Sequence, residues 1–260
     1  MSNRPIGIVA ADGSADSIAE RVAATGQRVM IYRLDRGHHG KRLTNIEAAS
    51  TATDIGFDCA LVLSFIDDTS VFREFLIGTP EKTGLAAEMN PGAILVDFGV
   101  RPPRETQALL GVTGMRGVAI LDAAFAATHN DVNAPAPSIL LGGFPDSVDV
   151  AEPILSLIGK VDRTGPLGSA HTTAALMGYL EAAHHIAHDE ALAVGHALGI
   201  PRDALQRHLD APQPETAAPN ILSMAARTRL VMKLAQDRGV AADVIDFTGT
   251  RLSQALSRRG

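Results

Sequence analysis

The sequence has a single cysteine and no excess of positive charge, and each lack excludes a class of protein. Cys59 cannot form a disulfide framework, and its place in the apolar stretch "DCALVLSF" indicates a small core residue rather than a nucleophile or a ligand. Lys and Arg total 23 against 29 Asp and Glu, so the net charge is -6. Nucleic acids and anionic membranes both favour basic proteins. We therefore expect a small molecule as the partner, with no nucleic acid and no membrane.

Long apolar runs are lacking as well. No stretch approaches the roughly 20 apolar residues that cross a bilayer. The beginning, "MSNRPIGIVA", has no apolar core preceded by positive charge, as a secretion signal would have. We therefore expect a cytoplasmic protein. Because 46% of the residues are hydrophobic and only 20% are charged, the chain should fold into compact domains.

The first part of the chain alternates short apolar runs with helical patterns. The runs are "IGIVA", "RVMIY", "CALVLSF", "AILVDF", "VAILDA" and "SILLGG". Strands that alternate with helices predict a mostly parallel sheet with helices on both faces. Continuous apolar strands fit a sheet that is covered on both sides. The fold class is thus α/β, with a Rossmann-like domain over residues 1–164.

The second part, residues 165–260, is predicted to be an all-α domain. Between Ser169 and Gly199 there is no proline, and apolar residues recur at helical spacing. This pattern predicts one long interdomain helix, well beyond the usual ~11 residues. Gly199 and Pro201 supply its stop signal. Three more helical patterns follow, with the proline-rich loop "DAPQPETAAPN" between the first and the second.

Residues 6–33, "IGIVAADGSADSIAERVAATGQRVMIYR", outline the strand, tight loop, helix and second strand of a dinucleotide-binding unit. Where that unit normally has three glycines, this chain has Ala10, Asp12 and Ala15. Each alanine adds only one methyl group, but Asp12 places a carboxylate where a diphosphate would lie. That carboxylate opposes binding unless the loop turns it away. Gly13 and Ser14 still precede a helix whose first amides can attract an anion.

The order of segments resembles the β-hydroxyacid dehydrogenase superfamily, which contains 3-hydroxyisobutyrate dehydrogenase and tartronate semialdehyde reductase, with imine reductases as cousins. The resemblance covers nearly the whole chain. It rests on the spacing from Ile6 to Gly26 and Tyr32, on "NPGAILVDFG", on "GVAILDAAF" followed by "LLGG", on "GPLGS" and on "DEALAVGHALGI". It implies an oxidoreductase that uses NAD or NADP and forms a homodimer through its C-terminal helices.

The resemblance also implies which residues bind the cofactor. Asp12, Gly13 and Ser14 belong to the phosphate loop. Three further positions lie at or just after the ends of two strand runs: Ser64 and Phe65 end "CALVLSF", and Val100 follows "AILVDF". An acidic residue at the end of the second strand suits a ribose 2′-hydroxyl, whereas a basic one suits a 2′-phosphate. This chain has Arg33 there and then Arg36, within "LDRGHHGKR". NADP is therefore expected before NAD. The alternative is a solvated basic loop with no dinucleotide bound.

The substrate side departs from the family's pattern. The family's carboxylate-binding Ser-Gly-Gly, its catalytic Lys with an Asn one turn later, and its later Lys-Asp pair are all replaced. The residues at these places are Ala126, Ala127 and Thr128, then Ala174 and Gly178, then Ala226 and Arg227. Neither Ala174 nor Gly178 can transfer a proton.

One face of the long helix supplies other candidates for proton transfer. The resemblance points this face into an interdomain cleft, and it carries His171, Glu181 and His185. A histidine can act near neutral pH as a general acid or base, and Tyr179 is the alternative donor if the helix is rotated. The segment His129, Asn130 and Asp131 either lines the same cleft or forms an exposed turn.

The same face also raises the question of a metal. Glu181 and His185, with His188 or Asp189, have spacings that could converge on one ion. Histidines one turn apart are common on solvated helices, however, and no H-E-x-x-H signature is present. We expect no metal.

Two functions follow from these observations. The first is an NADP-preferring oxidoreductase that transfers hydride to or from a small carbonyl, imine or hydroxy compound, with a non-standard proton donor. An imine fits the missing lysine, because an iminium ion already carries the charge that makes it accept hydride. The second is a lyase, isomerase, hydrolase or non-catalytic subunit on the same scaffold, whose dinucleotide site has been lost.

Overall fold

The computed structural model describes residues 4–35, 45–126, 137–210 and 221–257. The chain divides into two compact units, residues 1–178 and 179–260. This division falls inside the long helix α7 (Ser169–Ala197). The sequence predicts it earlier, at residue 164. The difference arises because the first turn of α7 is anchored on the sheet unit.

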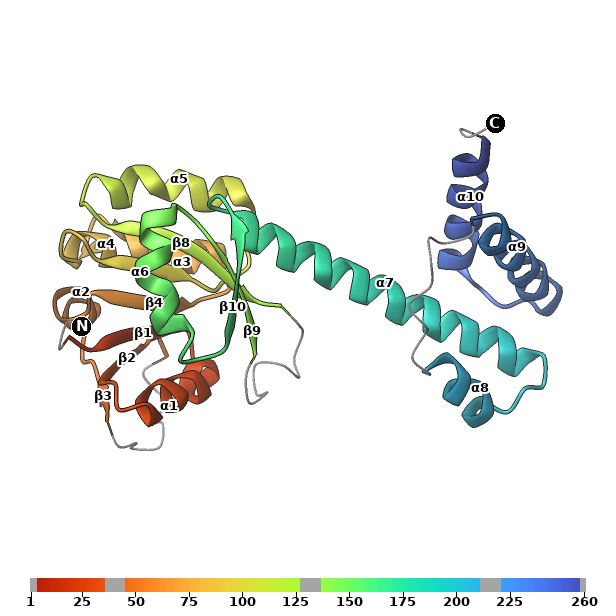
Figure 1. Ribbon diagram of the computed structural model, residues 1–260, viewed down its shortest axis with the longest axis horizontal. Helices are drawn as coiled ribbons and strands as arrows, with labels where there is room; N and C mark the ends of the chain where they lie inside the picture. The colour runs from red at the N-terminus through yellow and green to blue at the C-terminus, as the bar shows by residue number, and fades with distance from the viewer. Residues whose placement is uncertain (1–3, 36–44, 127–136, 211–220, 258–260) are drawn as a thin grey trace. The chain divides into compact units, whose positions relative to one another are not determined.

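The first unit is built around an eight-stranded sheet in the order β10-β9-β8-β7-β4-β1-β2-β3 (Figure 1). All neighbours are parallel except β8 and β9, which are antiparallel. The strands are β1 (Ile6–Ala10), β2 (Val29–Arg33), β3 (Ile46–Ala48), β4 (Leu61–Phe65), β7 (Ile94–Asp97), β8 (Ala119–Phe125), β9 (Ser138–Gly142) and β10 (Lys160–Gly165). The predicted α/β class and mostly parallel sheet are confirmed.

Helices cover both faces of the sheet, because alternate side chains of each apolar strand point to opposite sides. On one side, Ile8 and Leu63 pack with α1 (Asp16–Ala24) and α6 (Pro145–Leu155). On the other side, Val9 and Val62 pack with the helices that join the central strands. These helices are α2 (Ala52–Asp58), α3 (Thr69–Ile77), α4 (Leu85–Glu88) and α5 (Pro103–Gly114).

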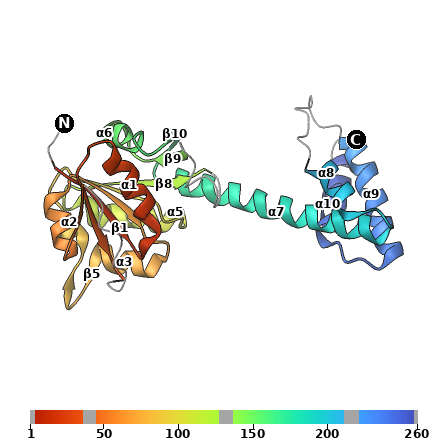
Figure 2. The ribbon, with the colours of Figure 1, turned by 90° about the horizontal axis from the view of Figure 1, so that it is seen from below.

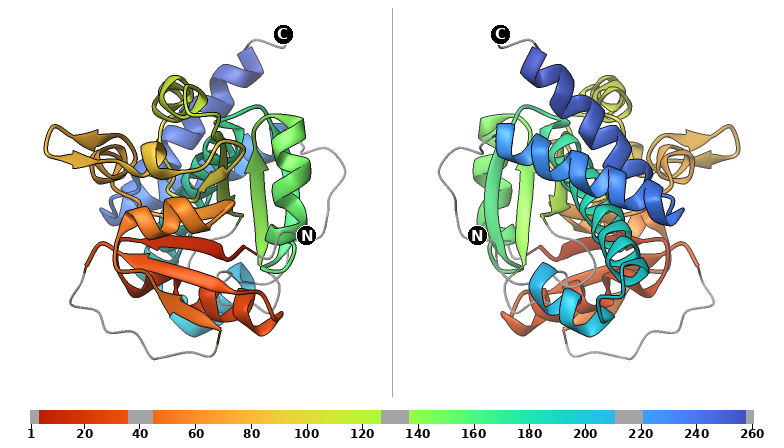
Figure 3. Two further views of the ribbon diagram at one scale, coloured as in Figure 1. Left: turned by 90° about the vertical axis from the view of Figure 1, so that its left-hand side faces the viewer. Right: turned by 90° about the vertical axis from the view of Figure 1, so that its right-hand side faces the viewer.

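Four strands were not predicted, because they carry no continuous apolar run. β3 and β10 are the edge strands of the sheet, and their side chains are exposed or half-buried. β5 (Gly78–Thr79) and β6 (Lys82–Thr83) form a short hairpin that projects beyond α3 (Figures 2 and 3). By contrast, Cys59 lies in the core as predicted, and burial raises the pKa of its thiol to about 12. The thiol is therefore neutral and unsuited to nucleophilic attack.

The second unit is helical, as predicted. It contains the end of α7, then α8 (Arg202–Leu209), α9 (Ile221–Arg238) and α10 (Asp243–Ser257), and Figure 3 shows α9 lying against α10. Gly199 follows α7 with φ +84° and the Ile200 N–H donates to the Gly195 carbonyl, which is the glycine-terminated helix end that the sequence predicts. None of the described helices combines the length and the apolar character of a membrane span.

Candidate functional site

The candidate site lies at the carboxyl ends of β1, β2 and β4, the edge at which open parallel sheets bind ligands. β1 ends at Ala10, a short helix η1 (Gly13–Ala15) follows, and α1 begins at Asp16. Ala10 and Ala15, which replace two glycines of the usual loop, are both fully buried in the core. Their methyl groups therefore fill space inside the protein and do not obstruct the ligand side of the loop.

Asp12 replaces the remaining glycine, and its carboxylate folds back onto the loop. Its Oδ1 accepts a hydrogen bond from the Ser14 N–H at 2.8 Å, which caps η1. This amide is one of the donors that a diphosphate would use at a helix start. A diphosphate at this loop must therefore compete with Asp12 for the Ser14 N–H.

Arg33 ends β2 and forms an ion pair with Asp16, the first residue of α1. Its Nε and Nη2 lie 3.2 and 2.5 Å from Asp16 Oδ1. The two side chains are 14% and 27% exposed, so water screens the pair only in part. The group that the sequence assigns to a 2′-phosphate thus already has a carboxylate partner within the chain. Arg36, the other predicted cation, lies outside the described residues.

A cavity of about 280 Å³ lies beside the end of β2. Tyr32 and Leu34 line it from the strand, and Val71 and Phe75 line it from α3, with Lys82 of the hairpin also on its wall. The rings of Tyr32 and Phe75 are stacked with their centroids 5.9 Å apart. The rest of the lining is mixed, with Ala52 beside the polar residues Glu74, Thr79 and Thr83. Aromatic and apolar side chains together with polar groups suit a planar heteroaromatic ring such as adenine. Sequence reasoning missed this cavity because α3 and the hairpin are distant from β2 along the chain.

Arg33 and this cavity lie on two sides of the same strand end. Side chains alternate along a strand, so Tyr32 and Leu34 face the cavity while Arg33 faces α1. A nucleoside seated at the tip of β2 would have the cavity on one side and the guanidinium on the other. The loop, the cation and the cavity together fit the adenosine half of a dinucleotide.

The other predicted cofactor residues lie at the same edge, with different surroundings. Ser64 is fully buried in β4, and its Oγ has no hydrogen-bond partner among the described residues. Phe65 is half-buried and stacks on Phe98 with 4.7 Å between ring centroids. Val100, beyond the end of β7, is exposed. Phe65 and Val100 can therefore meet a ligand at this edge, whereas Ser64 lies beneath it.

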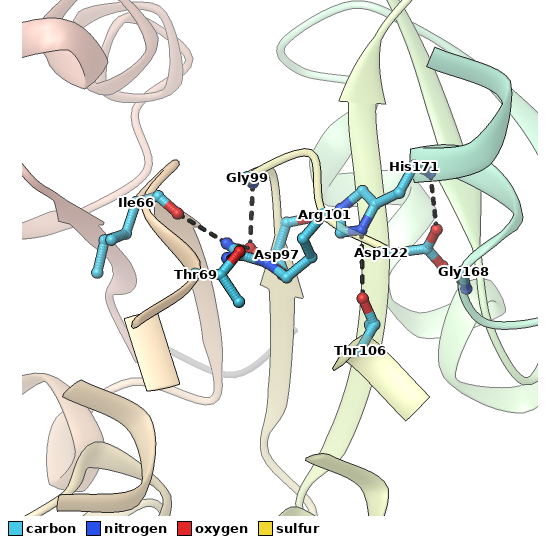
Figure 4. A network of polar contacts seen from close by, with 9 residues as sticks. All are labelled: Ile66, Thr69, Asp97, Gly99, Arg101, Thr106, Asp122, Gly168 and His171. Carbon is cyan, nitrogen blue, oxygen red and sulfur yellow. Dashed lines mark hydrogen bonds and ion pairs between the residues drawn. The ribbon is translucent and has the colours of Figure 1, made fainter. Parts of the chain in front are cut away.

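A buried ion pair links the end of β7 to the loop that follows it (Figure 4). Arg101 Nε lies 2.6 Å from Asp97 Oδ2 and Arg101 Nη2 lies 2.9 Å from Asp97 Oδ1, with both side chains fully buried. Arg101 also donates to the Ile66 carbonyl at 2.7 Å and lies over the Phe72 ring. Burial raises the pKa of Asp97, while the Arg101 guanidinium opposes that rise. Arg101 thus ties the loop after β7 to the loop after β4.

His171 belongs to the same buried network, whereas the sequence predicts that its side chain faces a cleft. Its ring is fully buried, with Nε2 3.0 Å from the Asp97 carbonyl oxygen and Nδ1 3.3 Å from Thr106 Oγ1 (Figure 4). Asp122 accepts hydrogen bonds from the N–H groups of Gly168 and His171 at 2.7 and 3.0 Å. A group that exchanges protons with a substrate must reach it, and this ring is enclosed by the protein. These contacts link the start of α7 to β7, β8 and α5.

The remaining candidates for proton transfer on α7 belong to the second unit, whereas His171 belongs to the first. Tyr179, Glu181 and His185 are all exposed on α7. His185 Nε2 lies 3.7 Å from Asp189 Oδ2. His188 lies 3.9 Å from Asp189 through Nδ1 and 2.9 Å from Asp210 Oδ1 through Nε2. Within the described part of the chain, no three His, Cys, Asp or Glu residues converge as metal ligands would.

Part of the predicted substrate side lies outside the described residues. Ala126 follows β8 and its N–H donates to the Ser138 carbonyl. Structure is described neither for Ala127 and Thr128 nor for the segment His129, Asn130 and Asp131. Ala226 and Arg227, in place of the family's later Lys-Asp pair, are exposed residues of α9.

Comparison with known proteins gives matches to NAD-binding domains and to dehydrogenases. Residues 14–177 match the family described as the NAD binding domain of 6-phosphogluconate dehydrogenase. L-threonate dehydrogenase of Cupriavidus necator is 29% identical over 162 residues, which are 62% of this chain and 53% of that protein. The chain spans about half the length of the curated relatives it matches.

Solved structures resemble the chain over nearly its whole length. The V8 variant of the imine reductase from Myxococcus stipitatus, in complex with NAD+, superimposes with a TM-score of 0.82 at 15% identity, covering 99% of this chain and 95% of that one. The imine reductase from the same organism in complex with NADP+ gives a TM-score of 0.80 at 15% identity, covering 98% and 94%. At such identities the likeness shows a shared fold.

Proposed function

Since the chain belongs to the family of the NAD binding domain of 6-phosphogluconate dehydrogenase, we propose that it is a nicotinamide-dinucleotide oxidoreductase that prefers NADP. Its reaction is hydride transfer to or from a small carbonyl, imine or hydroxy compound. The observation that carries the proposal is the end of β2, where Arg33 and a cavity lined by Tyr32 and Phe75 flank one strand tip. When bound, the nicotinamide supplies or accepts the hydride.

Each part of the site has a role in this proposal. The cavity would hold the adenine ring, Arg33 would bind the 2′-phosphate, and the amides of Gly13 and Ser14 at η1 would bind the diphosphate. Phe65 and Val100 cover the edge of the sheet beyond them. The buried Asp97–Arg101 pair keeps these loops in place.

The proton step lacks the family's usual donor. Ala174 and Gly178 carry no acid, and His171 is enclosed, which leaves the exposed Tyr179, Glu181 and His185 as the candidates on α7. An imine substrate reduces the demand on such a donor, because an iminium carbon accepts hydride without further protonation. We therefore favour an imine or amine as the substrate class.

The Arg33→Glu variant tests the cofactor assignment. The substitution places a negative charge where the 2′-phosphate would bind, so it should weaken NADPH binding at least tenfold more than NADH binding. Titration of the full chain, followed by nicotinamide fluorescence, measures both dissociation constants. Equal weakening of the two would contradict an NADP site at Arg33.

A second function is supported by the two carboxylates at the loop. Asp12 accepts the Ser14 N–H and Asp16 pairs with Arg33, so the chain satisfies part of its own anion site. The alternative is a non-redox enzyme or a non-catalytic subunit in which no dinucleotide binds. Absence of NADPH and NADH binding at millimolar concentration would favour it.

We also propose that the protein is a homodimer formed through its C-terminal helices. It would act on a small molecule in the cytoplasm. Support comes from exposed apolar side chains on these helices, which a monomer leaves in water. They include Leu176, Leu180 and Ile186 of α7 and Phe247 of α10.

A further inference from the structure

Asp16 is the only acidic side chain with which Arg33 pairs among the described residues. Both Nε and Nη2 of Arg33 converge on one oxygen of Asp16, and the pair is mostly shielded from water. Asp16 also begins α1, where a carboxylate is favoured by the helix dipole. The contact links residues 17 apart in sequence and holds the end of β2 against the helix that starts at the phosphate loop.

We infer that Asp16 sets the choice between the two cofactors, because its carboxylate competes with the 2′-phosphate of NADP for the Arg33 guanidinium. The inference rests on the proposed function. A phosphate monoester carries about −1.5 to −2 charges at neutral pH and binds the same donors as a carboxylate does. The Nε–H and one N–H of Nη2 point at Asp16 Oδ1, so a 2′-phosphate that binds this two-donor edge of Arg33 must displace the carboxylate from it. NAD has no such group and leaves the pair intact.

Asp12 cannot exert the same selectivity, so the two carboxylates affect cofactor binding differently. Its Oδ1 accepts the Ser14 N–H, at the place of the diphosphate. The diphosphate is common to NAD and NADP, so Asp12 opposes both equally. Asp16 acts only through Arg33, at the place where the two cofactors differ.

The opposite role for Asp16 is also testable. A carboxylate that holds an arginine can preorganise it for a phosphate, and its removal would then weaken NADP binding. Competition predicts that removing the Asp16 carboxylate strengthens NADPH binding, whereas preorganisation predicts that it weakens NADPH binding. The ratio of the NADH to the NADPH dissociation constant distinguishes them.

The experiment compares the full chain with its Asp16→Asn and Asp16→Ala variants by nicotinamide fluorescence. We expect the NADH to NADPH ratio of dissociation constants to rise about tenfold, the gain for one freed charge-assisted contact. Glu20→Gln, which removes a charge from an exposed position of α1, is the matched control and should leave the ratio unchanged. In an Arg33→Met background, Asp16→Asn should also have no effect on the ratio.

The outcomes separate this inference from the proposed function. A ratio that stays constant or falls in both Asp16 variants, while the unaltered protein binds NADPH, overturns the role of Asp16 and leaves the oxidoreductase proposal standing. If the unaltered protein and the variants all fail to bind either cofactor, both proposals are overturned. Thermal unfolding of each variant shows that the comparison is made on folded protein.

Discussion

Asp12 and Asp16 are two carboxylates that would oppose a bound dinucleotide in different ways. Both lie at the loop between β1 and α1, yet one accepts a backbone amide and the other pairs with Arg33. Sequence reasoning recognised Asp12, because it replaces a glycine of a known spacing. It missed Asp16, because nothing in the spacing shows that the side chain turns toward β2.

Replacing Asp12 by glycine should strengthen binding of both cofactors. The substitution removes a negative charge and frees the Ser14 N–H for the diphosphate, so NADPH and NADH should each bind about tenfold more tightly. Titrations of the two cofactors measure this. A change confined to NADPH would show that Asp12 acts elsewhere than at the diphosphate.

Replacing Arg101 by methionine should destabilise the first unit by about 3–5 kcal/mol at pH 8, because Asp97 is left as an uncompensated buried charge. Without Arg101, the pKa of Asp97 rises further above its usual range. At a pH above the usual range of an aspartate pKa, Asp97 is ionised in the unfolded chain but still protonated in the folded variant. The free energy of unfolding therefore falls as the pH rises toward the pKa of Asp97 in the folded state.

Denaturant unfolding of Arg101→Met at several pH values measures this effect. The loss of stability relative to the unaltered protein should be smaller at pH 5 than at pH 8. A loss that is independent of pH would mean that Asp97 does not carry the penalty. The double variant Asp97→Leu with Arg101→Met should recover much of the loss, since no buried charge then remains.

At the scale of elements, the start of α7 is fixed to the sheet by Asp122. This residue of β8 accepts the N–H groups of Gly168 and His171, and the His171 ring reaches the Asp97 carbonyl in β7. The strands β7 and β8 are thus both hydrogen-bonded to the start of α7. The first turn of α7 thus belongs to the first compact unit.

Asp122→Ala should destabilise the protein by about 2–4 kcal/mol, because two buried N–H groups lose their acceptor. Denaturant unfolding measures it, and Asp162→Ala in the more exposed edge strand β10 is the control, with a change within about 0.5 kcal/mol. An equally small change for Asp122→Ala would show that α7 does not depend on this acceptor.

The elements themselves were largely predictable from the sequence, because their signals are local. The six apolar runs became β1, β2, β4, β7, β8 and β9, and the proline-free run between Ser169 and Gly199 became α7. Interactions within the site were not predictable, because they join distant residues. His171 and Asp97 are 74 residues apart, so a helical face alone could not show that the ring is enclosed.

At the scale of the whole molecule, the proposed homodimer is a separate prediction. Analytical ultracentrifugation of the full chain should give a mass of twice 27.2 kDa. Leu180→Glu, which adds a charge to the exposed apolar side of α7, should shift the mass toward the monomer. A monomer for the unaltered protein at micromolar concentration would contradict the proposal.

We propose that the edge formed by β1, β2 and β4 accepts a nicotinamide dinucleotide, although Asp12 and Asp16 already bind two of the donors there. Titration of the unaltered full chain with NADPH, followed by nicotinamide fluorescence and calorimetry, tests it most directly. We expect saturable binding of one NADPH per chain at micromolar concentration, with displacement by adenosine 2′,5′-bisphosphate. No binding at millimolar NADPH would contradict it.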